Sequence, residues 1–129
     1  MITLRAVVAA VFIFAAGHTL GQAITEAQAV RAIVGESAGE SFRGKLAVAC
    51  AIRNRGTLAG VCGIAACHTD REPERVWREA RAAWRESAGR DITGGATHWE
   101  STNFKSPAWA SSMRETVRIG HHRFYRPSL

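Results

Sequence analysis

The feature that constrains the fold most is a run of seven residues, Leu46-Ala-Val-Ala-Cys-Ala-Ile52, in which no side chain is charged or strongly polar. A surface helix confines its apolar residues to one stripe, whereas a helix that is apolar on every side is buried. Ser41 suits the N-cap of such a helix and Gly56 suits its end, after a last turn that closes with Arg55. The sequence therefore predicts a central buried helix that the rest of the chain must surround.

Two further helices are predicted on either side of this central helix. Thr25 and Gln28 form a capping box at the start of the first, and Gly35 marks its end. Pro73 is placed well for the first turn of the other helix, which continues to Gly89. Their apolar residues recur at helical spacing, so each can bury one face against the central helix.

The C-terminal third of the chain is more mixed in pattern. Residues 96–99 fit a short strand, Ser106-Pro107 is expected to open a fourth helix through about Thr116, and the tail over 117–125 fits a hairpin or extended ending around Gly120. These elements together predict the α+β class, mainly α with a short β element.

Length and charge narrow the possible roles. A chain of 129 residues accommodates one domain. The formal net charge of +6 favours polyanionic partners, and arginines supply nearly all of the positive charge. They are spread without a dense block or an interleaved aromatic repeat, so we expect no nucleic-acid partner. Anionic lipid and an anionic cell wall are the other polyanions that this charge fits, and the charge alone does not choose between them.

The N-terminal residues have the three-part layout of a secretory signal. A short positive start to Arg5 precedes an apolar run over 6–17, and Gly21-Gln22-Ala23 offers the small residues of a cleavage site. The apolar run is shorter than the ~20 residues of a spanning helix. We predict a signal peptide or an uncleaved N-terminal anchor over 1–23, the only contact with a membrane, and an exported domain over 24–129, in the periplasm, the cell envelope or outside the cell.

The three cysteines leave their pairing open. Cys62 and Cys67 are able to pair in an oxidising compartment, whereas Cys50 falls inside the buried helix and is expected to behave as a small apolar residue. The cysteines at 62 and 67, with His68 and Asp70, do not have the spacing of a zinc site. We expect neither a metal nor another cofactor.

Two glutamates, Glu36 and Glu40, stand between the end of the first helix and the central helix, separated only by small residues. A carboxyl group at the C-terminal end of a helix and partly buried is favoured in its protonated form. A general acid needs that form in order to give a proton to a leaving oxygen. Spacing alone also fits two ordinary helix-end carboxylates, with Glu40 and Ser41 helping to cap the central helix.

Several motifs in a fixed order carry a family resemblance. The first is Ala32-Ile-Val-Gly-Glu-Ser-Ala-Gly-Glu-Ser-Phe-Arg-Gly-Lys-Leu-Ala-Val-Ala-Cys-Ala-Ile-Arg-Asn-Arg55, with two Gly-Glu pairs and a closing Asn-Arg. The others are Val61-Cys-Gly-Ile64, Thr93-Gly-Gly-Ala-Thr-His-Trp99, Pro107-Ala-Trp109 and Ile119-Gly-His-His-Arg-Phe-Tyr125. Together they resemble the cell-wall hydrolases related to spore cortex-lytic enzymes.

This resemblance implies a small lysozyme-like fold and cleavage of the β-1,4 bond between N-acetylmuramic acid and N-acetylglucosamine in peptidoglycan strands. The glutamate of the first Gly-Glu pair, Glu36, corresponds to the catalytic acid. Such enzymes typically act as lytic transglycosylases, which form a 1,6-anhydro product and require no second carboxylate. Glu40, Asp91 and Glu100 are the candidate partners if water is the nucleophile instead.

The substrate-binding candidates are His98, Trp99, Tyr125 and Glu40, and Trp109 is a further residue that is able to stack on a sugar or pack in the core. The chain departs from the family pattern in two places. Trp99 stands where the family has a tyrosine, and the stretch between Cys67 and Trp77 is shorter than usual. These departures concern the sugar-binding subsites rather than the fold.

Two other functions compete with this interpretation. The first is a thiol peptidase or amidase acting on stem peptides, with Cys50 as nucleophile and His98 as base. The second is a wall-binding envelope protein without catalytic activity. We expect the chain to be a monomer in each case.

Overall fold

The computed structural model describes residues 22–129. The predicted signal peptide or anchor over 1–23 therefore lies, apart from its last two residues, outside the described residues. Within 22–129, no helix combines the length and the apolar character that a membrane span requires.

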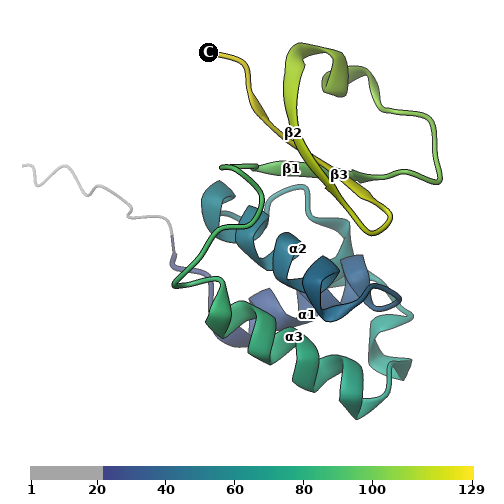
Figure 1. Ribbon diagram of the computed structural model, residues 1–129. Coiled ribbons are helices and arrows are strands. Elements are labelled where there is room, and N and C mark those ends of the chain that lie inside the picture. The colour runs from purple at the N-terminus through teal and green to yellow at the C-terminus, as the bar shows by residue number, and fades with distance from the viewer. Residues whose placement is uncertain (1–21) are drawn as a thin grey trace, which may run out of the picture.

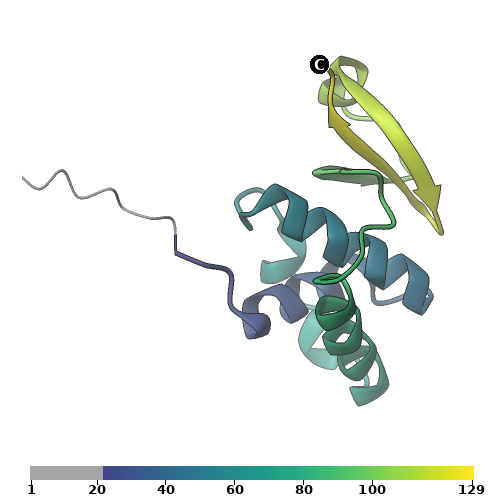
Figure 2. The ribbon, with the colours of Figure 1, turned by 60° about the vertical axis from the view of Figure 1, so that its left-hand side comes forward.

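Three α-helices form the larger part of the molecule: α1 (Glu26–Ser37), α2 (Phe42–Arg55) and α3 (Glu74–Glu86). Helix α2 lies between the β-sheet and the other two helices (Figures 1 and 2). Its residues from Leu46 to Ile52 are at most 2% exposed, because α1 and α3 cover one side and the sheet covers the other. The predicted central buried helix is confirmed.

A three-stranded antiparallel sheet lies on α2. The strands are β1 (His98–Ser101), β2 (Met113–Ile119) and β3 (His122–Pro127), in the order β1-β3-β2. Gly120, at φ 59, makes the tight turn of the β2–β3 hairpin, which projects beyond the helices (Figure 2). The predicted class, α+β with mainly α structure and a short β element, is confirmed.

Local signals placed most helix ends correctly. The capping box of Thr25 and Gln28 is present at the start of α1, Ser41 caps α2, and Gly56 ends α2 in the left-handed conformation at φ 70. Pro73 directly precedes α3, which ends at Glu86, three residues before the predicted end. Each of these signals acts within a few residues, so no tertiary contact is needed to read it.

The end of α1 was predicted wrongly, because the helix continues through Gly35 to Ser37. A Cβ atom on Gly35 would lie 2.0 Å from the carbonyl oxygen of Gly63, in the 3-10 helix η1 (Cys62–Ala65). Glycine is therefore needed at position 35 for the close approach of η1 rather than for a turn. As a result, Glu36 lies within the last helical turn.

The predicted fourth helix over 106–116 is wrong. A short 3-10 helix, η3 (Ala108–Ser112), follows Pro107, and the chain then enters β2 at Met113. Thr116, Val117 and Ile119 are β-branched, and the segment pairs along its length with β3. Pairing with a later strand outweighs the local helix signal of Ser106-Pro107.

The three cysteines, all of which lie within the described residues 22–129, form no disulfide. Cys50 is buried, whereas Cys62 and Cys67 are exposed and free. The prediction that Cys50 behaves as a small core residue is confirmed.

Candidate active site

Glu36 is held by groups from two distant segments. Its Oε1 accepts a hydrogen bond from the backbone N–H of Gly63 at 2.7 Å, and its Oε2 accepts one from the indole N–H of Trp99 at 3.3 Å. Helix α1, η1 and strand β1 thus meet at this one carboxyl group. The longer bond is the weaker of the two, so Oε2 is the less firmly held oxygen.

Two cavities meet at Glu36 and Trp99, since both residues line both cavities. The first cavity, of about 460 Å³, also contains Arg55, Cys62, His98 and Trp109. The second cavity, of about 510 Å³, is richer in titratable side chains: Glu40, His68, Glu72, Glu100, His121 and His122. Glu36 therefore stands where a ligand long enough to fill both cavities would pass.

Aromatic rings form one wall of the first cavity. The rings of His98 and Trp109 lie 5.4 Å apart between centroids, and Trp109 is 37% exposed. The Nδ1 atom of His98 is 2.8 Å from the hydroxyl of Thr97. Burial, together with the positive charge of Arg55, lowers the pKa of His98 below its ordinary value of 6.5, so its ring is neutral at neutral pH. The exposed indole of Trp109 and the half-buried imidazole of His98 thus present ring faces on which a ligand with an apolar face is able to stack.

Glu40 joins the helical part to the hairpin at the second cavity. Its Oε1 accepts a hydrogen bond from the backbone N–H of His121 at 2.9 Å and lies 3.5 Å from Nδ1 of His122. A Cβ atom on Gly120 would lie 2.3 Å from Oε2 of Glu40, so the turn needs glycine for this contact as well. Burial lowers the pKa of His122 despite the opposing charge of Glu40. The carboxylate of Glu40 thus serves the hairpin while it borders the cavity.

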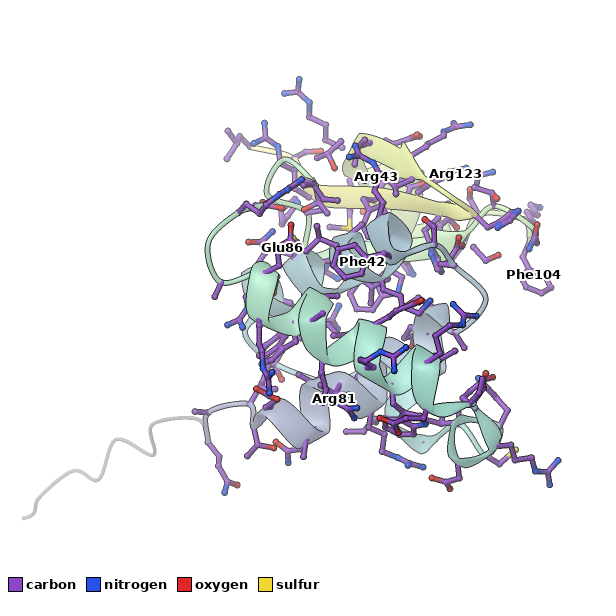
Figure 3. All side chains as sticks on the ribbon, turned by 60° about the horizontal axis from the view of Figure 1, so that its bottom comes forward. Phe42, Arg43, Arg81, Glu86, Phe104 and Arg123 are labelled. Carbon is purple, nitrogen blue, oxygen red and sulfur yellow. The ribbon has the colours of Figure 1, made fainter. Side chains whose placement is uncertain are left out.

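Tyr125 and Glu100 form a buried cluster at the edge of the second cavity. The Tyr125 hydroxyl donates to Oε1 of Glu100 at 2.5 Å, and Ser106 and Arg123 donate to the same oxygen at 2.8 and 3.0 Å. Burial raises the pKa of Glu100, but these hydrogen bonds outweigh burial and bring the pKa below its ordinary value of 4.5. Arg123 lies at the sheet, whereas the exposed side chain of Phe104 projects outward from the loop that follows β1 (Figure 3).

The structure gathers four of the five predicted site residues around the two cavities. His98 lines the first, Glu40 lines the second, and Glu36 and Trp99 line both. Tyr125 lines neither of them, is 5% exposed, and commits its hydroxyl to Glu100. Its ring instead supports Trp109, with centroids 5.4 Å apart.

Among the residues of the site that were not predicted from the sequence are Arg55, Gly63 and His68. The sequence predicts Arg55 only as a cation at the end of a helix, and it places Gly63 only within the motif Val61-Cys-Gly-Ile64. The Asn-Arg and Cys-Gly motifs were therefore available signals, because both recur in the family resemblance. For His68 no comparable signal exists, since it belongs to the stretch where the chain departs from the family.

The thiol of Cys50 is in a poor environment for catalysis. It is 1% exposed and its Sγ donates to the carbonyl oxygen of Arg90 at 3.3 Å. Burial raises its pKa, which disfavours the nucleophilic thiolate. Among residues 22–129, no three His, Cys, Asp or Glu side chains come together in a way that would hold a metal ion.

The fold and the site define a mainly α, lysozyme-like domain of the α+β class, with one carboxyl group between two open cavities. No protein-family model matches the sequence, and no curated protein matches it.

Two solved structures are similar to the chain. The catalytic domain of the SleB protein of Bacillus cereus has 28% sequence identity and a TM-score of 0.57, over 78% of this chain and 88% of that one. The catalytic domain of the germination-specific lytic transglycosylase SleB from Bacillus anthracis has 26% sequence identity and a TM-score of 0.63, over 78% of this chain and 93% of that one. The resemblance predicted from the motifs is confirmed, and the chain forms a SleB-like domain.

Proposed function

We propose that this protein is an exported peptidoglycan lytic transglycosylase that cleaves the β-1,4 bond between N-acetylmuramic acid and N-acetylglucosamine, with Glu36 as its acid and base. The similarity to a germination-specific lytic transglycosylase supports the reaction class. The observation that carries the proposal is the position of Glu36 between two cavities, anchored by Gly63 and Trp99. A glycan strand is a ligand of the length and shape that two adjoining cavities accept.

The reaction needs one group that gives a proton and then takes one back. Protonated Glu36 donates its proton to the glycosidic oxygen as the bond from that oxygen to muramic C1 breaks. The resulting carboxylate accepts the proton of the muramic C6 hydroxyl while the C6 oxygen attacks C1. The 1,6-anhydro ring closes, Glu36 is protonated again, and no water is consumed.

The two oxygens of Glu36 are suited to different tasks. The 2.7 Å bond from Gly63 fixes Oε1, whereas the 3.3 Å bond from Trp99 leaves Oε2 more weakly held. We assign proton transfer to Oε2 for this reason. The short backbone contact then acts as the anchor that keeps the carboxyl group oriented.

The three other carboxylates that the sequence offered as candidates, Glu40, Asp91 and Glu100, do not fit the task of activating water. Oε1 of Glu100 already accepts three hydrogen bonds, and its lowered pKa makes it a weak base. Asp91 is used by the turn that follows it, since its oxygens accept from Thr93 and Gly95. Glu40 is committed to the hairpin. This supports an internal hydroxyl, rather than water, as the nucleophile.

Product analysis after digestion of purified sacculi tests the proposal. Mass spectrometry should detect 1,6-anhydro-muropeptides with the wild-type protein and none with Glu36→Gln. Cys50→Ala should retain activity, because the thiol is buried away from both cavities. Reducing-end sugars would instead indicate a hydrolase, and freed stem peptides an amidase. Sacculi that bind the protein but release no fragment would leave only the wall-binding alternative.

A further inference from the structure

The first cavity holds one guanidinium group, that of Arg55, in the last turn of α2. Arg31 and Arg123 pair with Asp70 and Glu100, at 2.6 and 3.0 Å. In contrast, no carboxylate within residues 22–129 forms an ion pair with Arg55. Its charge therefore faces the cavity without an ion-pair partner from the described part of the chain.

Backbone groups hold this guanidinium in place. One terminal nitrogen donates to the carbonyl oxygen of Ala59 at 2.6 Å, and the other donates to that of Thr97 at 3.3 Å. A Cβ atom on Gly60 would lie 3.1 Å from the guanidinium, so a glycine at φ 77 gives the group room. The Nε atom is buried and has no hydrogen-bond partner within residues 22–129. Since arginine carries further N–H donors, this group is oriented without being satisfied.

The charges of the cavity favour an anion beside Arg55. His98 carries no charge at neutral pH, since burial and the charge of Arg55 lower its pKa. Glu36 is the only acidic residue among those that line the first cavity, and the hydrogen bond from Gly63 holds it. The remaining lining is aromatic or small: Gly60, Val61, Cys62, Trp99 and Trp109. A planar carboxylate is the anion whose geometry matches the fork of a guanidinium.

We propose that Arg55 binds a carboxylate of the substrate in the first cavity and thereby selects peptide-bearing glycan strands. This inference rests on the proposed function, because the stem peptides of peptidoglycan supply free carboxylates next to the scissile bond. It places the muramic residue, which carries the peptide, on the Arg55 side of Glu36. The second cavity then receives the adjoining part of the strand.

The test compares two forms of one substrate. Soluble glycan strands with native stem peptides are compared with strands whose carboxylates have been converted to methylamides with carbodiimide and methylamine. The wild-type protein should prefer the native strands by about 10- to 100-fold in kcat/KM, the loss expected for one charge-assisted pair. Arg55→Gln should reduce this preference to the part that the net positive charge of the protein contributes. Arg55→Lys should retain more of it, because it keeps the charge but not the fork.

Arg114→Gln is the matched control. It removes the same charge from an exposed position on β2 that lines neither cavity, so the preference should remain at the wild-type value. A purely structural role for Arg55 would lower kcat/KM equally on both substrates and leave their ratio unchanged. An unchanged ratio in Arg55→Gln overturns the inference.

A binding measurement separates this inference from the proposed function. The Glu36→Gln variant is combined with Arg55→Gln, and sedimentation with native and amidated strands is compared for the single and double variants. Preferential binding of native strands that depends on Arg55 supports the anion site, even if the wild-type protein cleaves neither substrate. Equal binding of native and amidated strands by the Glu36→Gln variant overturns the anion site at Arg55. The transglycosylase proposal is then still decided by the product analysis.

Discussion

At the scale of single residues, the reach of Glu36 is the most sensitive quantity in the proposed reaction. Glu36→Asp removes one methylene and withdraws the carboxyl group from both Trp99 and the scissile bond. Misplacement of about 1 Å can cost about 100-fold in rate, and we expect a fall in kcat of this order. Release of anhydro-muropeptides from sacculi measures it, with the unfolding temperature as a check on folding. Near-normal turnover would contradict the role of Glu36.

Glu100 gives a pH-dependent contribution to stability. Its pKa is depressed in the folded protein, so its contribution is fully present above the ordinary value of 4.5 and is lost as pH falls through the lower folded value. Glu100→Gln should reduce the free energy of unfolding at neutral pH by about 1.5–3 kcal/mol, the range for hydrogen bonds to a charged group. Below pH 4.5 the difference from wild type should shrink.

Denaturant unfolding of both proteins at neutral pH and near pH 3 checks this expectation. Glu115→Gln is a suitable control, because Glu115 pairs only with Arg118 on the exposed face of β2. Loss of this ion pair should change the free energy of unfolding by less than about 1 kcal/mol at either pH. If the wild-type protein exceeds Glu100→Gln in free energy of unfolding by more near pH 3 than at neutral pH, the expected direction of the pH dependence is wrong.

At the scale of elements, the contact between α1 and η1 positions the catalytic candidate. A Cβ atom on Gly63 would lie 2.7 Å from both Cγ and the backbone nitrogen of Glu36. Gly63→Ala should therefore displace η1 or Glu36 and destabilise the protein by about 1–3 kcal/mol, the cost of an overpacked site. We also expect loss of most activity, because the backbone N–H of residue 63 anchors Glu36.

Gly89→Ala is the matched control for this prediction. Gly89 is exposed, lines neither cavity, and a Cβ atom there would come no closer than 3.9 Å, to the carbonyl oxygen of Glu86. The change should leave stability within about 0.5 kcal/mol of wild type. Denaturant unfolding and sacculus digestion of the two variants compare the sites. Equal behaviour of Gly63→Ala and Gly89→Ala would show that the close approach of η1 to α1 is unimportant.

How far the sequence predicted these elements depends on how local their causes are. The caps at Thr25, Ser41 and Gly56 act within a few residues and were predicted correctly. The end of α1 and the first part of β2, over 113–116, depend on contacts with Gly63 and β3, so local patterns misassigned both. The hairpin around Gly120 was predicted correctly. The same limit applies to the site. The motif indicated Glu36, but its bond to Trp99 joins residues 63 positions apart.

At the scale of the whole molecule, the site arises where the helical part meets the sheet. Glu36 lies in the last turn of α1 and Arg55 in the last turn of α2, so two helix ends face the cavities. Strand β1 brings His98 and Trp99 against them, and β3 holds β1 in register by pairing Trp99 with Phe124. Neither part has a complete site by itself, which explains why the hairpin is tied to the helices through Glu40.

The net charge of +6 adds a long-range attraction to an anionic wall, and this attraction should be sensitive to salt. Screening shortens from about 10 Å at 0.1 M to about 3 Å at 1 M. Raising ionic strength over that range should weaken sedimentation of the protein with sacculi by about 10-fold or more. Carboxylate-amidated sacculi are the control, because their binding rests on contacts within the cavities and should change little. Binding to native sacculi that is equally strong at both salt concentrations would mean that short-range contacts alone hold the protein to the wall.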